Sequence, residues 1–218
     1  MATRLDPKAL RVYVVTSGTL VSGRGHREIA AAAISGGATA IQLRAPELDD
    51  AVLLPLARDL ATACHRAGVL FIVNDRVDVA ATARADGVHL GQGDAPEEAL
   101  AALGPEWVLG ISVRGADQAR AAEAAGADYL GVTVWSTATK PEAVAEGLQG
   151  VAEVVAATAL PVVGIGGIDA GNARRVIQAG ASGVAVISAV AAAPDPVAAT
   201  RELRGVVAGS IEGPGGTE

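Results

Sequence analysis

The chain has few aromatic residues, one cysteine and a deficit of positive charge. Aromatic residues make up 2% of the sequence, and Cys64 is the single cysteine. One cysteine excludes a disulfide within the monomer, and its place in an apolar helical pattern predicts a buried or half-buried thiol rather than a reactive one. The 24 acidic residues outnumber the 17 basic ones, which gives a net charge of -7. Because the chain lacks the basic surface that binds a phosphate backbone, we expect no nucleic-acid partner.

Long apolar runs are also missing. No run approaches the roughly 20 apolar residues of a membrane-spanning helix, and residues 1–10 lack the apolar core of a secretory signal. We therefore expect a cytoplasmic protein with no membrane partner. No Ser/Pro-rich linker or block of charge divides the 218 residues, which predicts a single domain over residues 1–208. Residues 209–218 are polar and rich in glycine, and we expect a flexible C-terminal tail there.

The sequence does contain a regular alternation of two kinds of segment. Short runs rich in valine and isoleucine are typical of strands buried on both faces, and they occur at 12–16, 40–44, 70–74, 87–91, 108–113, 129–134, 161–166 and 183–188. Alanine-rich segments with helical periodicity lie between them, including 51–66, 116–125, 147–158 and 172–179. Strictly alternating strands and helices predict parallel pairing through right-handed crossovers.

Eight such units favour an α/β fold, a single-domain (β/α)8 TIM barrel. The alternative architecture is a doubly wound open sheet. Its dinucleotide-binding form needs a glycine fingerprint after the first strand, whereas Gly164-Ile165-Gly166-Gly167 has a different spacing and lies near the end of the chain. We therefore predict the barrel.

Catalytic groups of a (β/α)8 barrel lie where the strands end. The predicted strand ends carry a series of polar or glycine residues, which are Thr16, Ser17, Gln42, Arg44, Asn74, Asp75, Gln92, Asp94, Ser112, Arg114, Thr137, Thr139, Lys140, Gly166, Gly167 and Ser188. The opposite rim receives small-residue turns, which offer little chemistry. The sequence therefore predicts an active site at the carboxyl ends of the strands.

Two aspartates follow neighbouring strands of the predicted barrel. Asp75 and Asp94 are hard oxygen ligands of the kind that Mg2+ prefers, and this ion is commonly held by one or two carboxylates together with substrate phosphates. Each aspartate could instead cap the helix that follows it. The two roles are compatible, and the sequence does not choose between them.

The last two strand ends favour a phosphate site. Gly166-Gly167 and Ser188 lie where barrels bind phosphate through backbone amides, although a tight turn alone would also need glycine. Arg44 and Lys140 are the cations placed to hold a polyphosphate on the other side of the rim. We interpret the chain as an enzyme that binds one phosphate group near the last two strands and a second, magnesium-associated one near the second to fourth strands.

His89 lies inside the fourth predicted strand, before its end. We predict a neutral buried histidine with a satisfied hydrogen bond rather than a catalytic base.

Five motifs, in this order along the chain, resemble those of thiamine phosphate synthases. They are Gln42-Leu43-Arg44, Asn74-Asp75-Arg76, Gly87-Val88-His89-Leu90-Gly91-Gln92 with Asp94, Thr137-Ala138-Thr139-Lys140 and Ile165-Gly166-Gly167-Ile168. The resemblance implies a transferase of thiamine biosynthesis on a TIM barrel. Such an enzyme joins hydroxymethylpyrimidine pyrophosphate to thiazole phosphate with Mg2+, and gives thiamine phosphate and pyrophosphate.

The resemblance also implies a role for each matching residue. Asp75 and Asp94 would bind the metal, and Arg44 and Lys140 would act in catalysis. The pyrimidine pyrophosphate would be held by Gln42, Arg44, Asn74, Ser112 and Lys140. The thiazole phosphate would be held by Thr137, Thr139, Gly167, Ile187 and Ser188.

One departure from the family pattern leaves two alternatives open. Ala45-Pro46 follows Arg44, where the family usually has an acidic residue and a phosphate-binding lysine. The chain could therefore be a paralogue that binds thiazole phosphate without turnover. A thiazole tautomerase-like isomerase is the other alternative, since those relatives share the barrel and the Asn74-Asp75-Arg76 segment. The expected partners are small phosphorylated molecules, and whether the protein forms a homo-oligomer is left open.

Overall fold

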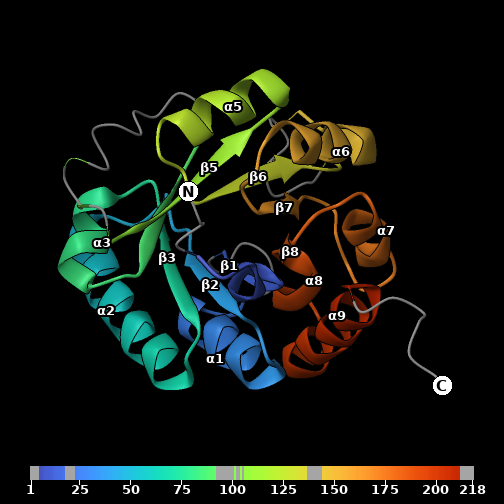
Figure 1. Cartoon of the computed structure of the whole chain (residues 1–218). Coiled ribbons are helices and arrows are strands. Elements are labelled where there is room, and N and C mark those ends of the chain that lie inside the picture. Colours follow the sequence, from blue (N-terminus) through green and yellow to red (C-terminus); the bar gives the residue numbers. More distant parts are fainter. Residues whose placement is uncertain are drawn as a thin grey trace.

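A closed barrel of parallel strands forms the centre of the molecule (Figure 1). The computed structural model describes residues 5–17, 23–91, 101, 104, 106–136 and 144–211. Within them the strands pair in sequence order, as β1 (Val12–Thr16), β2 (Ala40–Leu43), β3 (Leu70–Asn74), β4 (Gly87–Leu90), β5 (Val108–Val113), β6 (Tyr129–Thr133), β7 (Val162–Ile165) and β8 (Gly183–Val186). The pairing of β1 with β8 closes the ring, so the predicted (β/α)8 barrel is confirmed and the open sheet is wrong.

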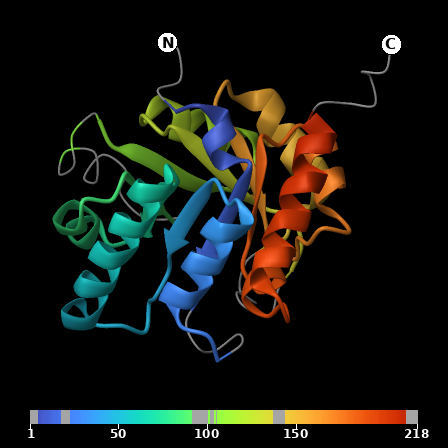
Figure 2. The ribbon, with the colours of Figure 1, turned by 90° about the horizontal axis from the view of Figure 1, so that it is seen from below.

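Helices surround the barrel on its outside (Figure 1). The α-helices are α1 (His26–Gly36), α2 (Asp50–Ala67), α3 (Val77–Ala83), α5 (Ala116–Ala124), α6 (Gly147–Ala157), α7 (Ala173–Gln178), α8 (Ser188–Ala191) and α9 (Pro196–Ile211). A short 3-10 helix, η1 (Pro7–Leu10), covers the end of the barrel at which the strands begin (Figure 2). The opposite end, where the strands finish, is therefore the one available for a site.

Side chains that alternate along each strand divide the core into two layers. Val12 and Val14 of β1 point outward and pack in the cluster between barrel and helices, whereas Tyr13 and Val15 belong to the cluster inside the barrel. Inside, the buried residues are Leu5, Leu10, Tyr13, Val15, Ala40, Ile72, Tyr129, Val163 and Ala185. The tyrosines are the largest of them and fill the middle of the barrel.

Polar side chains fix the register of alternate strands at the end where they begin. In three places the residue just before an even-numbered strand accepts a hydrogen bond from an amide of the strand before it. The three bonds run from Val12 N to Thr39 Oγ1 (2.9 Å), from Phe71 N to Asp86 Oδ2 (2.7 Å) and from Leu109 N to Asp128 Oδ2 (2.9 Å). These carboxylates and the hydroxyl are structural, since they satisfy backbone groups that no strand partner reaches.

Helix α2 carries the single cysteine on its inner face. Cys64 is fully buried, and burial, with a smaller effect of the Asp86 charge, raises the pKa of its thiol to about 12. The prediction of a buried thiol is confirmed. No helix in the described ranges has the length and apolar character that crossing a membrane would require.

Helix α9 extends beyond the domain boundary predicted at residue 208. It continues through Gly209 to Ile211, and the Ser210 hydroxyl donates to Val206 O (2.5 Å) inside its last turn. Residues 209–211 therefore belong to the helix, because its hydrogen bonding continues past the glycine. The rest of the predicted tail, residues 212–218, lies outside the described residues.

Candidate functional site

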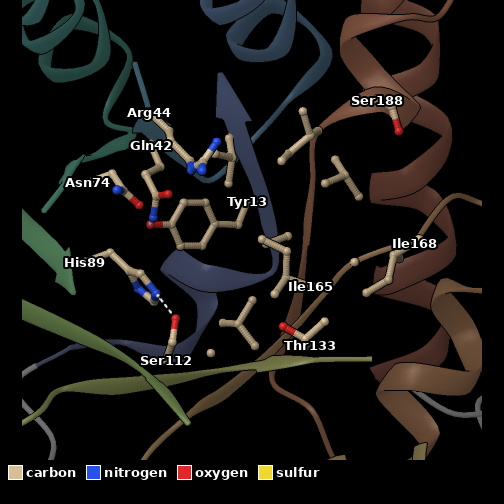
Figure 3. Close-up of a pocket in the computed structure, with 18 of the residues that line it drawn as sticks. Tyr13, Gln42, Arg44, Asn74, His89, Ser112, Thr133, Ile165, Ile168 and Ser188 are labelled. Carbon is tan, nitrogen blue, oxygen red and sulfur yellow. Dashed lines mark hydrogen bonds between the residues drawn. The ribbon is translucent and has the colours of Figure 1, made fainter. Parts of the chain in front are cut away.

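A pocket opens at the end of the barrel where the strands finish (Figure 3). It brings together seven of the predicted site residues: Gln42, Arg44, Asn74, Ser112, Gly167, Ile187 and Ser188. Asp75 directly follows Asn74 but does not line this pocket. Four other predicted residues, Asp94, Thr137, Thr139 and Lys140, lie outside the described residues.

A chain of hydrogen bonds crosses the floor of the pocket. The Gln42 amide Nε2 donates to the Tyr13 hydroxyl (2.8 Å), which lies 2.9 Å from the Tyr129 hydroxyl. Tyr129 in turn lies 3.0 Å from His89 Nδ1, and His89 Nε2 lies 2.9 Å from Ser112 Oγ. Figure 3 shows Gln42 and Tyr13 on one side and His89 and Ser112 on the other. This hydrogen-bond network thus joins Gln42 and Ser112, two predicted substrate-binding residues that belong to different strands.

One direction of the hydrogen bonds in this network gives every hydroxyl hydrogen of the two tyrosines an acceptor. Because Gln42 gives a hydrogen to Tyr13, a consistent arrangement has Tyr13 donating to Tyr129, Tyr129 donating to His89 Nδ1, and His89 Nε2 donating to Ser112. Burial raises the pKa of both tyrosine hydroxyls, so each keeps its proton. Ser112 Oγ then accepts a bond, and its own hydrogen can be directed to a substrate.

His89, Tyr13 and Tyr129 are site residues that the sequence pattern did not single out as such. Both ring nitrogens of His89 have partners, as predicted, but the residue is half-buried and lines the pocket. A signal was present for the tyrosines, since the chain has only two and each lies in a strand. A hydroxyl inside an apolar barrel needs a partner, which points to a polar network.

Arg44 provides positive charge at the mouth of the pocket. It follows β2, is half-buried, and reaches over Gln42 toward the cavity (Figure 3). No acidic side chain of the described ranges forms an ion pair with it, whereas the arginines at 24, 27, 76 and 120 each have such a partner. An uncompensated guanidinium in a chain of net charge -7 favours an anionic ligand here.

Glycine and serine backbone forms the opposite side of the pocket. Gly166 and Gly167, after β7, have φ values of 94° and 63°, which favour glycine. A side chain on Gly167 would bring its Cβ to 3.1 Å from the Trp135 Cβ. Helix α8 is only four residues long, so a helix dipole adds little, and any phosphate would depend on the glycine turn and Ser188. A tight turn alone would explain these φ values. The glycines therefore agree with a phosphate-binding turn and with a purely structural one.

Asp75 has an unusual backbone conformation at the end of β3. Its φ is 61°, its amide donates to His89 O (2.9 Å), and the Asn74 side-chain amide donates to its Oδ2 (2.5 Å). The cap position of α3 is held by Arg76, which makes no side-chain cap bond, so Asp75 lies one residue before the cap position predicted for it. Within the described ranges no three His, Cys, Asp or Glu side chains cluster to hold a metal.

His26 forms a second polar cluster beside the rim, which no sequence motif indicated. Its Nδ1 lies 2.8 Å from Thr16 Oγ1, and that hydroxyl donates to Gln42 O (3.2 Å), so the imidazole is the donor of the pair. Its Nε2 is buried without a hydrogen-bond partner and lies 3.7 Å from Glu47 Oε1. Burial lowers the pKa of His26, and Glu47 opposes part of that effect.

This cluster predicts a pH dependence of stability. A histidine whose pKa is lower in the folded state than in the unfolded chain costs stability as the pH falls below about 6.5, because the unfolded state then binds more protons. We expect His26→Asn, which keeps a donor toward Thr16, to reduce the fall in unfolding free energy between neutral and mildly acidic pH. Glu47→Gln should steepen it. Urea denaturation of the three proteins across this range is the measurement, and parallel curves would contradict the prediction.

The chain is similar to known proteins over most of its length. The family model described as thiamine monophosphate synthase matches residues 12–190. The thiamine-phosphate synthase of Moorella thermoacetica is 49% identical over 199 residues, which cover 90% of this chain and 95% of the relative. That of a Roseiflexus strain is 47% identical over 204 residues, which cover 92% of this chain and 86% of the relative.

A solved structure agrees with the sequence relatives. Thiamine phosphate pyrophosphorylase from Pyrococcus furiosus matches with a TM-score of 0.86 and 39% identity, over 93% of this chain and 97% of that one. The resemblance inferred from the five motifs is thus confirmed, and the chain belongs to the thiamine monophosphate synthase family.

Proposed function

We propose that this protein is a thiamine-phosphate synthase, a transferase that couples hydroxymethylpyrimidine pyrophosphate to thiazole phosphate. The observation that carries the proposal is the arrangement of one pocket. Arg44, without an acidic partner among the described residues, stands on one side of it, and Gly167 and Ser188 stand on the other. Two anionic groups could thus be held across a single cavity, with the reacting atoms between them. The names of the family members support the same activity.

The floor of the pocket suits an aminopyrimidine. Gln42 uses its amide nitrogen for Tyr13, which leaves its side-chain oxygen as an acceptor for an exocyclic amino group. In the arrangement inferred above, Ser112 accepts from His89 and can donate its own hydrogen to the substrate. A ring would rest on the apolar lining provided by Val163 and Ile165.

Departure of pyrophosphate breaks the bond between the pyrimidine methylene carbon and oxygen. Negative charge develops on the leaving group, and the Arg44 guanidinium can stabilise it through two parallel hydrogen bonds. Lys140 would add a second cation. The electron-rich aminopyrimidine spreads the positive charge that is left on carbon.

The donor set of the rim fits Mg2+. Asp75, beside the Asn74 amide, would supply a hard carboxylate, and Asp94 would supply a second; one or two carboxylates plus substrate phosphates are the usual ligands of this ion. When bound, Mg2+ would neutralise charge on the departing pyrophosphate.

The thiazole substrate completes the reaction. The backbone at Gly167 and the Ser188 side chain would hold its phosphate, so that its ring nitrogen faces the methylene carbon and forms the new bond with its lone pair. That nitrogen carries no proton, so no strong base is needed. This agrees with a pocket in which both His89 nitrogens are already engaged. Positioning and electrostatics would supply most of the rate.

A coupling assay tests the proposed function. Purified protein with both substrates should form thiamine phosphate in the presence of Mg2+, lose at least about 100-fold of its rate in EDTA, and recover it when Mg2+ is restored. Product formation would show that Ala45-Pro46 is tolerated. Binding of thiazole phosphate without product at any Mg2+ concentration would instead favour the non-catalytic paralogue, and isomerisation of a thiazole carboxylate phosphate without coupling would favour the tautomerase.

A further inference from the structure

Arg24, in the segment between β1 and α1, reaches across to the far end of the chain. Its guanidinium donates from Nη1 to Ala191 O (2.9 Å) and Ala193 O (2.8 Å), and from Nη2 to Pro194 O (3.2 Å). These carbonyls belong to the end of α8 and the turn that leads to α9. Figure 1 shows α1, α8 and α9 side by side where the first and last strands meet. One side chain therefore joins the first and last units of the barrel.

Helix α8 is short, and the packing of its buried residues Val190 and Ala191 holds it together with this contact. It contains four residues, too few for a helix that is stable alone. The carbonyls of Ser188 and Val190 accept from the amides of Ala192 and Ala193, and the carbonyl of Ala191 at the end of the helix accepts from Arg24. Arg24 supplies charge-assisted hydrogen-bond donors to the carbonyls at and after that end. Its Nε also lies 3.3 Å from Glu28 Oε1, and this ion pair orients the guanidinium. The Arg24 guanidinium therefore binds three carbonyls while Glu28 holds its orientation.

The other end of α8 lies at the pocket. Ile187 and Ser188 line the cavity opposite Arg44, as Figure 3 shows for Ser188, whereas Arg24 does not line it. Ala191, whose carbonyl Arg24 binds, lies only three positions after Ser188. A shift of the held end would therefore move the Ser188 side chain and amide directly.

We infer that Arg24 is a positioning residue for the phosphate-bearing thiazole substrate. It acts through α8, by holding Ile187 and Ser188 in place at one side of the pocket. This inference rests on the proposed function for the identity of the ligand, but the contact itself does not. Because the pyrimidine side of the pocket is built from β2 to β5, the effect of Arg24 should be confined to one substrate.

Kinetics of Arg24 variants test the inference. We expect Arg24→Ala to raise KM for thiazole phosphate about 10-fold or more while KM for the pyrimidine pyrophosphate changes less than about 2-fold. Arg24→Lys keeps the charge but cannot reach three carbonyls, and should remain impaired. Added guanidinium ion should partly restore Arg24→Ala. Arg27→Ala is the matched control, because Arg27 lies on α1 and pairs with Asp59 at the surface (2.6 Å).

A binding measurement separates this inference from the proposed function. Titration calorimetry with thiazole phosphate should show weaker binding to Arg24→Ala than to the unmodified protein and to Arg27→Ala, even if no variant has coupling activity. An equal rise of both KM values, unchanged binding, or the same loss in Arg27→Ala would overturn the role given to Arg24. Absence of coupling with selective loss of thiazole phosphate binding would overturn the proposed reaction and support the role of Arg24.

Discussion

Arg44→Ala is expected to lower kcat/KM by about 100- to 1,000-fold and to leave the fold intact, because removing one partner of a desolvated charge pair costs about 2–5 kcal/mol. The guanidinium is half-buried at the pocket and has no acidic partner in the described part of the chain. We therefore expect its stabilising contact to be with the substrate. The loss should fall on KM for the pyrophosphate substrate and on kcat together, since the charge on that group grows as it departs.

Arg44→Lys separates charge from geometry. Lysine keeps the positive charge but cannot form two parallel hydrogen bonds to one phosphate group, so it should recover only part of the lost rate. Arg120→Ala is a suitable control, because Arg120 is exposed on α5 and pairs with Asp117 (2.6 Å). Steady-state kinetics with each substrate varied is the measurement. A kcat/KM for Arg44→Ala within about 3-fold of the unmodified protein would show that the anion is held elsewhere.

The strands could be predicted closely because their sequence signal is local. Each predicted run contains its observed strand, and β1, β3 and β5 agree at both ends. The differences lie mostly at the carboxyl ends, where the predicted runs extend too far, as at Arg44 and Ser188. Strand pairing stops as the chain turns out to the rim, although apolar residues continue the pattern at Val134 and Ile187. Several of those end residues line the pocket, namely Arg44, Gly166, Ile187 and Ser188.

The network on the pocket floor could not be predicted in the same way. Gln42 meets Tyr13 across β2 and β1, and His89 meets Ser112 across β4 and β5. Such pairs depend on strand register and on the face of the sheet to which each side chain points. Neither can be predicted from the sequence of one strand alone. The contact of Arg24 with the carbonyls at and after the end of α8 could not be predicted for a related reason, because its partners are backbone groups about 170 residues away.

Gly110→Ala is expected to destabilise the barrel severely, although it adds only one methyl group. Gly110 lies on β5 directly opposite Tyr129 on β6, and a Cβ there would stand 2.1 Å from Tyr129 Cζ and 2.4 Å from its hydroxyl oxygen. Tyr129 is fully buried, and its hydroxyl is held by Tyr13 and His89, so the ring cannot move aside without breaking that network. Ordinary overpacking costs about 1–3 kcal/mol, and this change should exceed that range or prevent folding.

Two further variants identify the cause of the loss. Gly205→Ala on α9 adds the same methyl group where no atom lies within 4 Å, and should stabilise the protein by about 0.5–1 kcal/mol. Tyr129→Leu removes the ring atoms that the new Cβ meets. The double variant with Gly110→Ala should therefore be less destabilised in urea than the sum of the single changes. Additive losses, or a Gly110→Ala protein as stable as the unmodified one, would mean that the ring has room to move. In that case the hydrogen-bonded chain to Ser112 would not be fixed by packing, and the direction inferred for the Ser112 hydroxyl would lose its basis.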